Sequence, residues 1–88
     1  MVKWQVVLSS QAVKDAKRLN QAGLRQKAEQ LLQIIKEDPF ARQPAYKKLV
    51  GNLSGFYSRR INIQHRLVYS VDQTEYVVHI LRMWSHYE

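Results

Sequence analysis

The sequence of 88 residues contains no cysteine and no long apolar run. The absence of cysteine excludes disulfide bonds, thiolate metal ligands and a cysteine nucleophile. No apolar stretch approaches the roughly 20 residues that cross a bilayer, so no membrane segment is expected. The opening residues, MVKWQVVLSS, carry too short an apolar run for a signal peptide. These absences predict a soluble protein of the cytoplasm.

Acidic residues are scarce. Seven Asp and Glu oppose 14 Lys and Arg, which gives a formal net charge of +7. Such a balance favours a polyanion such as RNA or DNA, an anionic membrane surface or an acidic protein as partner, and charge alone does not choose among them. No cluster of His, Asp and Glu has the spacing of metal ligands, so neither a metal site nor a cofactor is expected. No glycine-rich phosphate loop is present.

The spacing of apolar residues predicts two helices, over 11–20 and 24–36. Ser9 and Ser10 are candidate N-caps for the first helix, because a hydroxyl can accept an unpaired backbone N–H group of the first turn. Gly23 is the natural turn residue between the helices. Asp38 precedes a proline, a position that disfavours helix, so the second helix is expected to end there. One domain over 1–88 is expected from this length.

Short runs rich in β-branched and aromatic residues predict five strands, over 2–8, 48–50, 57–63, 66–71 and 76–83. Tight turns join the later strands, which favours antiparallel pairing. The predicted order is β-α-α-β-β-β-β. The expected fold is therefore α+β, with two N-terminal helices packed on one face of a twisted antiparallel sheet.

The stretch 52–69, NLSGFYSRRINIQHRLVY, concentrates three arginines: Arg59, Arg60 and Arg66. Alternation along a strand places Arg59 on one face with Tyr57 and Ile61, and Arg60 on the other face with Ser58. No carboxylate occurs between positions 39 and 71. An external phosphate is therefore favoured over an internal salt bridge as the partner of these guanidinium groups. An acidic residue folded over from elsewhere (Glu29, Glu37 or Glu75) remains an alternative.

Other polar residues have simple structural interpretations. Basic residues of the two predicted helices are read as a solvated face, which an acidic partner could also bind. Tyrosine and tryptophan on strands more often pack in or beside a core than bind a ligand. Histidines His65, His79 and His86 are each more often incidental than catalytic when no partner can be identified.

The composite NLSGFYSRRINIQHRLVYSV, the DPF turn after the second helix and the terminal WSHYE resemble the YoeB/Txe branch of the RelE superfamily of bacterial toxins. The resemblance covers essentially the full length. It implies a microbial ribonuclease-like (RelE-like) fold and a ribosome-dependent mRNA endonuclease, the toxin of a type II toxin–antitoxin system. The implied partners are mRNA, the 30S decoding site of the ribosome and a cognate acidic antitoxin of the YefM/Phd kind. Operator DNA is reached only through the antitoxin complex, and a homodimer is an implied assembly.

The implied reaction is metal-free cleavage of RNA by the ribose 2′-hydroxyl. It needs a base, cations for the charge on the phosphorane, and an acid for the leaving oxygen. By position, Arg66 is the transition-state cation and Arg60 a phosphate contact. His86 is the implied general acid, and Tyr87 orients it or stacks on a base. Two weaker expectations are RNA contacts by Arg59 and Lys48.

Lys47 departs from the pattern of the family, because YoeB-like sequences carry a glutamate as general base at this position. Three explanations compete. Lys47 could take the proton itself, since neighbouring cations favour its neutral amine. The change could instead be inactivating, whether natural or introduced, and this explanation is preferred. Finally, the correspondence in this loop could be off by one, although no nearby carboxylate fills the role. A non-catalytic module that binds RNA or an antitoxin, or an operon co-regulator, is the alternative function.

Overall fold

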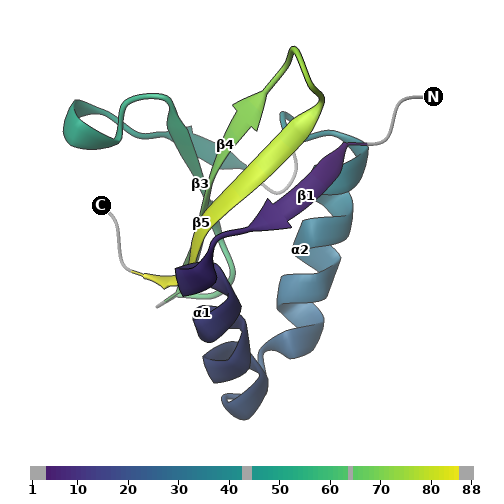
Figure 1. Cartoon of the computed structure of the whole chain (residues 1–88). Helices are drawn as coiled ribbons and strands as arrows, with labels where there is room; N and C mark the ends of the chain where they lie inside the picture. The colour runs from purple at the N-terminus through teal and green to yellow at the C-terminus, as the bar shows by residue number, and fades with distance from the viewer. Residues whose placement is uncertain (1–3, 43–44, 64, 86–88) are drawn as a thin grey trace.

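Five strands form one mixed sheet in the computed structural model, which describes residues 4–42, 45–63 and 65–85, with backbone alone for Trp84 and Ser85 (Figure 1). The order in the sheet is β1-β5-β4-β3-β2. The elements in chain order are β1 (Gln5–Leu8), α1 (Ser10–Gln21), α2 (Arg25–Glu37), β2 (Tyr46–Lys48), a 3-10 turn (Gly51–Leu53), β3 (Phe56–Arg60), β4 (Arg66–Asp72) and β5 (Val77–Ser85). The predicted α+β class and element order are confirmed.

The expectation of a wholly antiparallel sheet is wrong at one pair. β1 runs parallel to β5, with Gln5 opposite Val77 and Leu8 opposite Ile80. The other three pairs, β2–β3, β3–β4 and β4–β5, are antiparallel as expected. Tight turns reveal pairing only between strands adjacent in the chain, and β1 and β5 are the first and last strands. Their pairing depends on the way both helices fold back over the sheet.

The hydrophobic core lies between the two helices and one face of the sheet. Its buried side chains come from both helices, from β4 and β5, and from the β3–β4 loop: Ala12, Leu19, Ala28, Leu31, Ile35, Ile61, Leu67, Tyr69, Val78, Ile80 and Met83. The opposite face of β3 and β4 carries the polar Ser58, Arg60 and Arg66 together with the buried Val68. No helix in the described part of the chain is both long and apolar enough to cross a bilayer.

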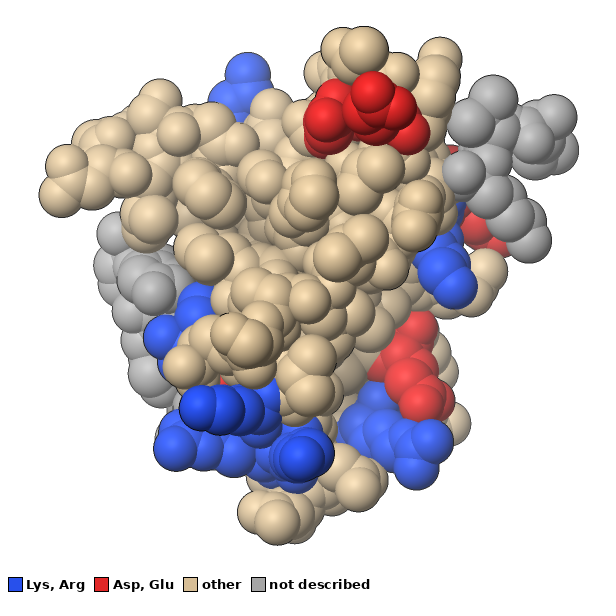
Figure 2. All heavy atoms as spheres, viewed as in Figure 1, with Lys and Arg blue, Asp and Glu red and all other residues tan. Residues whose placement is uncertain are grey.

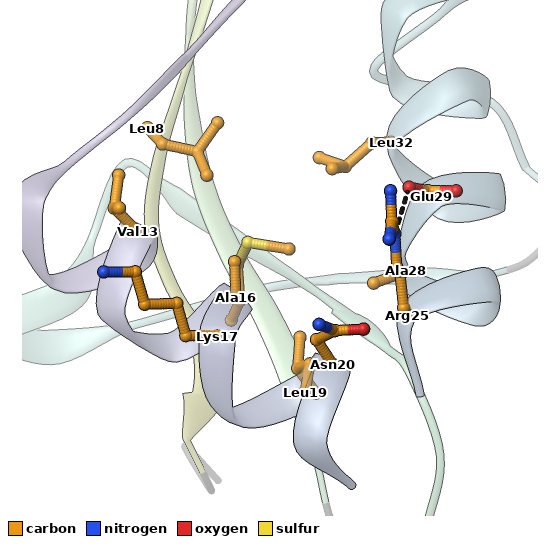
Figure 3. A pocket seen from close by; sticks show the side chains of 11 residues that line it. Leu8, Val13, Ala16, Lys17, Leu19, Asn20, Arg25, Ala28, Glu29 and Leu32 are labelled. Carbon is orange, nitrogen blue, oxygen red and sulfur yellow. Dashed lines mark hydrogen bonds and ion pairs between the residues drawn. The ribbon is translucent and has the colours of Figure 1, made fainter. Parts of the chain in front are cut away.

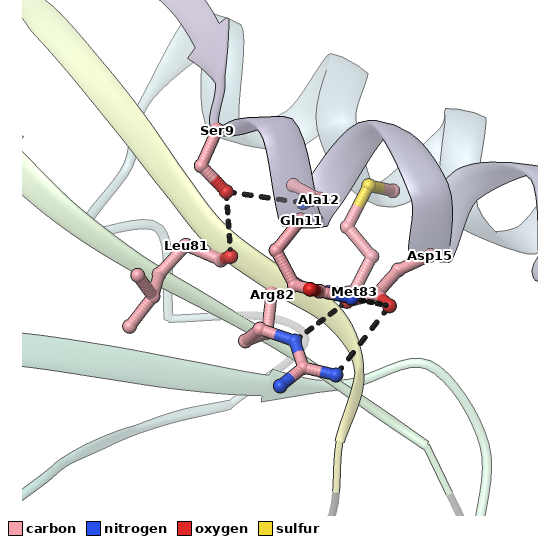
Figure 4. Close-up of polar contacts among 7 residues, drawn as sticks. All are labelled: Ser9, Gln11, Ala12, Asp15, Leu81, Arg82 and Met83. Carbon is pink, nitrogen blue, oxygen red and sulfur yellow. Dashed lines mark hydrogen bonds and ion pairs between the residues drawn. The ribbon is translucent and has the colours of Figure 1, made fainter.

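Hydrogen bonds from α1 hold the second half of β5 (Figure 4). Ser9 is the N-cap of α1: its Oγ accepts a bond from the Ala12 N–H (3.0 Å) and donates one to the Leu81 carbonyl (2.8 Å). The fully buried Asp15 carboxylate accepts bonds from Arg82 Nε (2.8 Å) and the Met83 N–H (3.1 Å). The first helix is thereby tied to the end of the last strand.

The β4–β5 register shifts twice in this braced region, between Arg66 and Val68 and between Val68 and Tyr69. Shifts of this kind bend a strand and are common beside functional sites. The result is that Ser85, the last residue of β5, lies opposite Arg66. The end of the last strand therefore reaches the arginine-rich part of β3 and β4.

Candidate nucleic-acid interface

A hollow of about 390 Å³, here called the cationic pocket, opens beside β2, β3 and β4. Its lining residues are Ala45, Tyr46, Lys47, Ser58, Arg60 and Arg66. Strand pairing brings them together: Lys47 lies opposite Ser58, and Arg60 lies opposite Arg66. Directly opposed residues share a face of the sheet, and so do residues two apart on one strand. Lys47, Ser58, Arg60 and Arg66 therefore lie on the face opposite the core.

The charged side chains described in this pocket are all positive. They are Lys47, Arg60 and Arg66, and none of the described lining residues is acidic. Lys47 and Arg60 are exposed, and Arg66 is half-buried. Guanidinium groups on rigid strands present fixed donors that match the oxygens of a phosphate. The pocket is thus suited to bind an oxyanion.

Ser58 forms part of the floor of the cationic pocket. Its side chain is nearly enclosed, with 2% of its surface exposed, and its Oγ has no hydrogen-bond partner in the part of the chain that the structure describes. Sequence reasoning placed Ser58 on the face of Arg60 but gave it no role. The sequence signal that could have identified Ser58 is its place two residues before Arg60, on the same strand face as this predicted site residue.

Arg59 requires a correction, because it was expected to contact RNA. Its side chain is fully buried on the core face. The guanidinium donates to Tyr69 Oη (2.9 Å) and to the carbonyls of Pro39 (2.9 Å) and Ala41 (2.8 Å). It also lies over the Tyr46 ring, 5.0 Å from the ring centroid. Arg59 therefore joins the segment after α2 to the sheet and is shielded from any ligand.

Tyr69 completes this buried network by donating its own O–H to the Pro39 carbonyl (2.8 Å). Burial raises the pKa of the Tyr69 hydroxyl above its ordinary value, and the nearby Arg59 charge opposes that rise only in part. Tyr69 consequently stays protonated and keeps its donor role throughout the physiological range. The sequence carried a hint of this arrangement, since Arg59 alternates with Tyr57 and Ile61 on one strand face.

Three other predicted site residues lie outside the pocket or outside the described residues. Lys48 is exposed, but it pairs with Tyr57 and so faces the side of the sheet opposite Lys47. His86 and Tyr87 fall outside the described residues. They follow Ser85, which pairs with Arg66, directly in the sequence.

Two carboxylates of the described residues form ion pairs away from the cationic pocket. Glu29, one of the acidic residues that might have folded over the arginines, instead bonds Arg25 at 2.9 Å. Asp15 pairs with Arg82. Burial tends to raise the pKa of Asp15, but the hydrogen bonds from Arg82, Met83 and Gln11 outweigh it and hold that pKa below its ordinary value. Among the described residues, no group of three or more His, Cys, Asp or Glu side chains is placed to hold a metal ion.

A second hollow, of about 370 Å³, lies between the two helices and is mostly apolar (Figure 3). Leu8, Val13 and Leu32 project into it, while Lys17 and the Arg25–Glu29 pair lie at its rim. It has no cluster of cations and lies on the core side of the sheet, so it does not fit a phosphate backbone. We therefore regard the cationic pocket as the candidate interface.

Positive charge is also spread over the helices. Figure 2 shows basic side chains gathered near the lower ends of α1 and α2, and acidic ones over the β4–β5 turn. The basic residues predicted to form a solvated face are all exposed: Lys14, Lys17, Arg18, Arg25, Lys27 and Lys36. Net charge alone therefore does not locate the interface, whereas the way β2, β3 and β4 bring their cations together does.

Comparison with known proteins decides the family. Residues 9–87 match the model of the YoeB-like toxins of bacterial type II toxin–antitoxin systems. The chain belongs to this family. Toxin YoeB of Synechocystis is 42% identical over 48 residues, which is 54% of this chain and 56% of that relative. The chain thus spans a little over half the length of this curated YoeB relative.

Solved structures of YoeB toxins share the fold over nearly the whole chain. A YoeB/ParE toxin from Agrobacterium tumefaciens superposes with a TM-score of 0.85 at 27% identity, covering 94% of this chain and 99% of that one. YoeB from Staphylococcus aureus, solved in complex with YefM, gives a TM-score of 0.79 at 35% identity, covering 97% and 99%. The same S. aureus toxin has also been solved as a dimer. The predicted YoeB and RelE relationship is confirmed.

Proposed function

We propose that this YoeB-like toxin binds mRNA in the decoding site of the ribosome and cuts it there without a metal. The observation that carries the proposal is the convergence of Lys47, Arg60 and Arg66 on one pocket, where no acidic residue occurs among the described lining residues. In the proposed reaction the ribose 2′-oxygen attacks the adjacent phosphorus and the 5′-oxygen leaves. The products are a 2′,3′-cyclic phosphate and a free 5′-hydroxyl.

Each proposed role follows from what the reaction needs. Arg66 and Arg60 offset the negative charge that grows on the phosphorane oxygens, an effect that is largest in a water-poor site. His86 donates a proton to the leaving 5′-oxygen, and Tyr87 orients it or stacks on a base. Lys48 faces the other side of the sheet, so its contact with the RNA backbone would be made at the outer edge of β2. The 2′-proton needs a base, and Lys47 occupies the position where relatives of this family are expected to carry a glutamate.

We infer that cleavage is slow in this chain because of Lys47. Lys47 places a cation where a carboxylate is expected. The cation raises the affinity of the pocket for phosphate, and the expected proton acceptor is lost. General-base help is worth about 10²–10⁴-fold in rate. The same substitution favours a second candidate function, a non-catalytic module that binds RNA or the antitoxin.

The test is to map cuts in mRNA on purified ribosomes by primer extension. We expect cuts within the decoding-site codon that persist in EDTA, need the 2′-hydroxyl and leave a 5′-hydroxyl. Arg66→Ala and His86→Ala should both abolish them without unfolding the protein. Unchanged cleavage in His86→Ala would rule out its role as acid. If neither this chain nor its Lys47→Glu variant cuts, the nuclease proposal is wrong and the binding module takes its place.

The proposed partners are a YefM-like acidic antitoxin and a second copy of the chain. S. aureus YoeB has been solved with YefM and as a dimer, which supports both. An acidic antitoxin also complements the net charge of +7. Co-expression with the small acidic protein encoded beside this gene should yield a stable complex. If the chain copurifies with neither the antitoxin nor a second copy of itself, both proposed assemblies are contradicted.

A further inference from the structure

We propose that the Ser58 hydroxyl is a phosphate-binding group of the cationic pocket, hydrogen-bonding an oxygen of the bound phosphodiester. The inference rests on the proposed RNA-binding function. It concerns binding and is independent of whether the chain cuts. Ser58 would add a neutral donor to the three cations that line the same hollow.

The first argument is the unsatisfied hydroxyl itself. Ser58 has 2% of its surface exposed, and its Oγ has no hydrogen-bond partner among residues 4–42, 45–63 and 65–85. Among the described side chains it is the only buried polar group left in this state. Folding normally removes such groups, because a buried polar atom without a partner is costly. An unpaired hydroxyl in the free protein is explained if a bound ligand supplies its hydrogen-bond partner.

The second argument is its location. Ser58 lies opposite Lys47 across the β2–β3 pair and two residues before Arg60 on the same face. Side chains opposed in this way have Cβ atoms about 4.5–5.5 Å apart. An anion held by the exposed Lys47 ammonium and the Arg60 guanidinium therefore lies within reach of Ser58. Because the lysine stem is flexible, the Lys47 ammonium can adjust its position to an anion bound beside Ser58.

The structural alternative is that the unpaired hydroxyl is merely tolerated. The two accounts make different predictions for Ser58→Ala. Both expect an unchanged or higher melting temperature, since the substitution removes an unsatisfied polar atom. Only the proposal expects weaker binding of phosphate.

The experiment measures binding of a 2′-O-methyl RNA trinucleotide, which cannot be cut, and of inorganic phosphate, by NMR titration. Ser58→Ala should weaken binding of the trinucleotide about tenfold, which is typical for a lost hydrogen bond to a charged group. Ser58→Thr and Ser58→Val have the same shape and differ by one hydroxyl, so Thr should bind more tightly than Val. Ser70→Ala, on the same face of β4 but outside the pocket, should leave affinity unchanged.

Equal affinities for the Thr and Val variants, or an unchanged affinity in Ser58→Ala, would overturn the proposal. Failure of all variants, the parent chain included, to bind the trinucleotide while still binding phosphate would contradict the RNA site and leave an oxyanion site. Because no readout depends on cleavage, loss of nuclease activity does not affect the result.

Discussion

Two neighbouring arginines on β3 do opposite jobs. Arg59 is wholly buried, and its guanidinium donates hydrogen bonds to Tyr69 Oη and to the carbonyls of Pro39 and Ala41. Arg60, one residue later, is exposed and faces the cationic pocket. The pleat of a strand sends successive side chains to opposite faces, so one dipeptide supplies both a structural brace and a cation that lines the pocket.

Alanine substitution should separate these jobs. Arg59→Ala leaves buried acceptors unpaired and opens a cavity, so we expect a loss of about 3 kcal/mol or more in the free energy of unfolding. Arg59→Lys should recover only part of this loss, because an ammonium cannot reproduce the planar fork. Arg60→Ala, the matched control, should change stability by less than about 0.5 kcal/mol and weaken RNA binding about tenfold. Urea denaturation and RNA titration measure the two effects. Equal stability losses would contradict this division of roles.

Among the elements, β5 has the most specialised role. It pairs with β1 on one side and β4 on the other, and its second half is tied to α1 through Ser9 and Asp15. The register shifts in this half bring Ser85 opposite Arg66. The brace from α1 therefore fixes the strand end from which the proposed acid His86 follows.

The Asp15 brace should make stability depend on pH. The pKa of Asp15 is lowered in the folded protein, so its contribution is complete above the unfolded value of about 4 and is lost as pH falls through the lower folded value. Asp15→Asn should cost about 1–3 kcal/mol at neutral pH and flatten the acid side of the stability curve. Urea denaturation between about pH 6 and pH 2.5 measures both. Asp72→Asn, at the exposed β4–β5 turn, is the control. An acid profile identical to that of the parent chain would show that Asp15 contributes nothing.

At the scale of the whole molecule, the position of the charge matters more than its amount. Exposed lysines and arginines cover α1 and α2, yet the cations with converging geometry lie on the other face of the sheet. The two faces are thus available to different partners. We propose that the helices bind an acidic antitoxin and that the cationic pocket binds RNA.

Salt dependence should distinguish the two faces. For single-stranded RNA, the logarithm of the binding constant falls with the logarithm of the salt concentration, with a slope of about −0.7 per contacted phosphate. Arg60→Gln should make that slope shallower by about 0.7, the value for one phosphate contact. Lys14→Gln removes the same charge from the exposed face of α1 and should leave the slope unchanged. Equal effects of both substitutions would mean that RNA responds to net charge and not to the pocket.

Much of this organisation could be predicted because it is local. Periodicity predicted both helices to within a residue or two, and the Ser9 cap and Gly23 turn have direct chemical signals. The β1–β5 pairing could not be predicted from local signals, because it joins the ends of the chain. The burial of Arg59 could be predicted from its alternation with Tyr57 and Ile61 on one strand face. Its positive charge instead suggested a contact with RNA. Asp15 likewise lies between the buried Ala12 and Leu19 of α1, where a carboxylate needs a partner.

We propose that the cationic pocket is a ribonuclease site that retains its phosphate-binding groups and has lost its base. The most direct test is the single-turnover rate at which ribosome-bound mRNA is cut by this chain and by Lys47→Glu, with Lys47→Gln as the uncharged control. We predict that glutamate raises the rate by about 10²–10⁴-fold and glutamine does not. Adding Arg66→Ala to the glutamate variant should abolish the gain. A glutamate variant no faster than the parent chain would contradict the account.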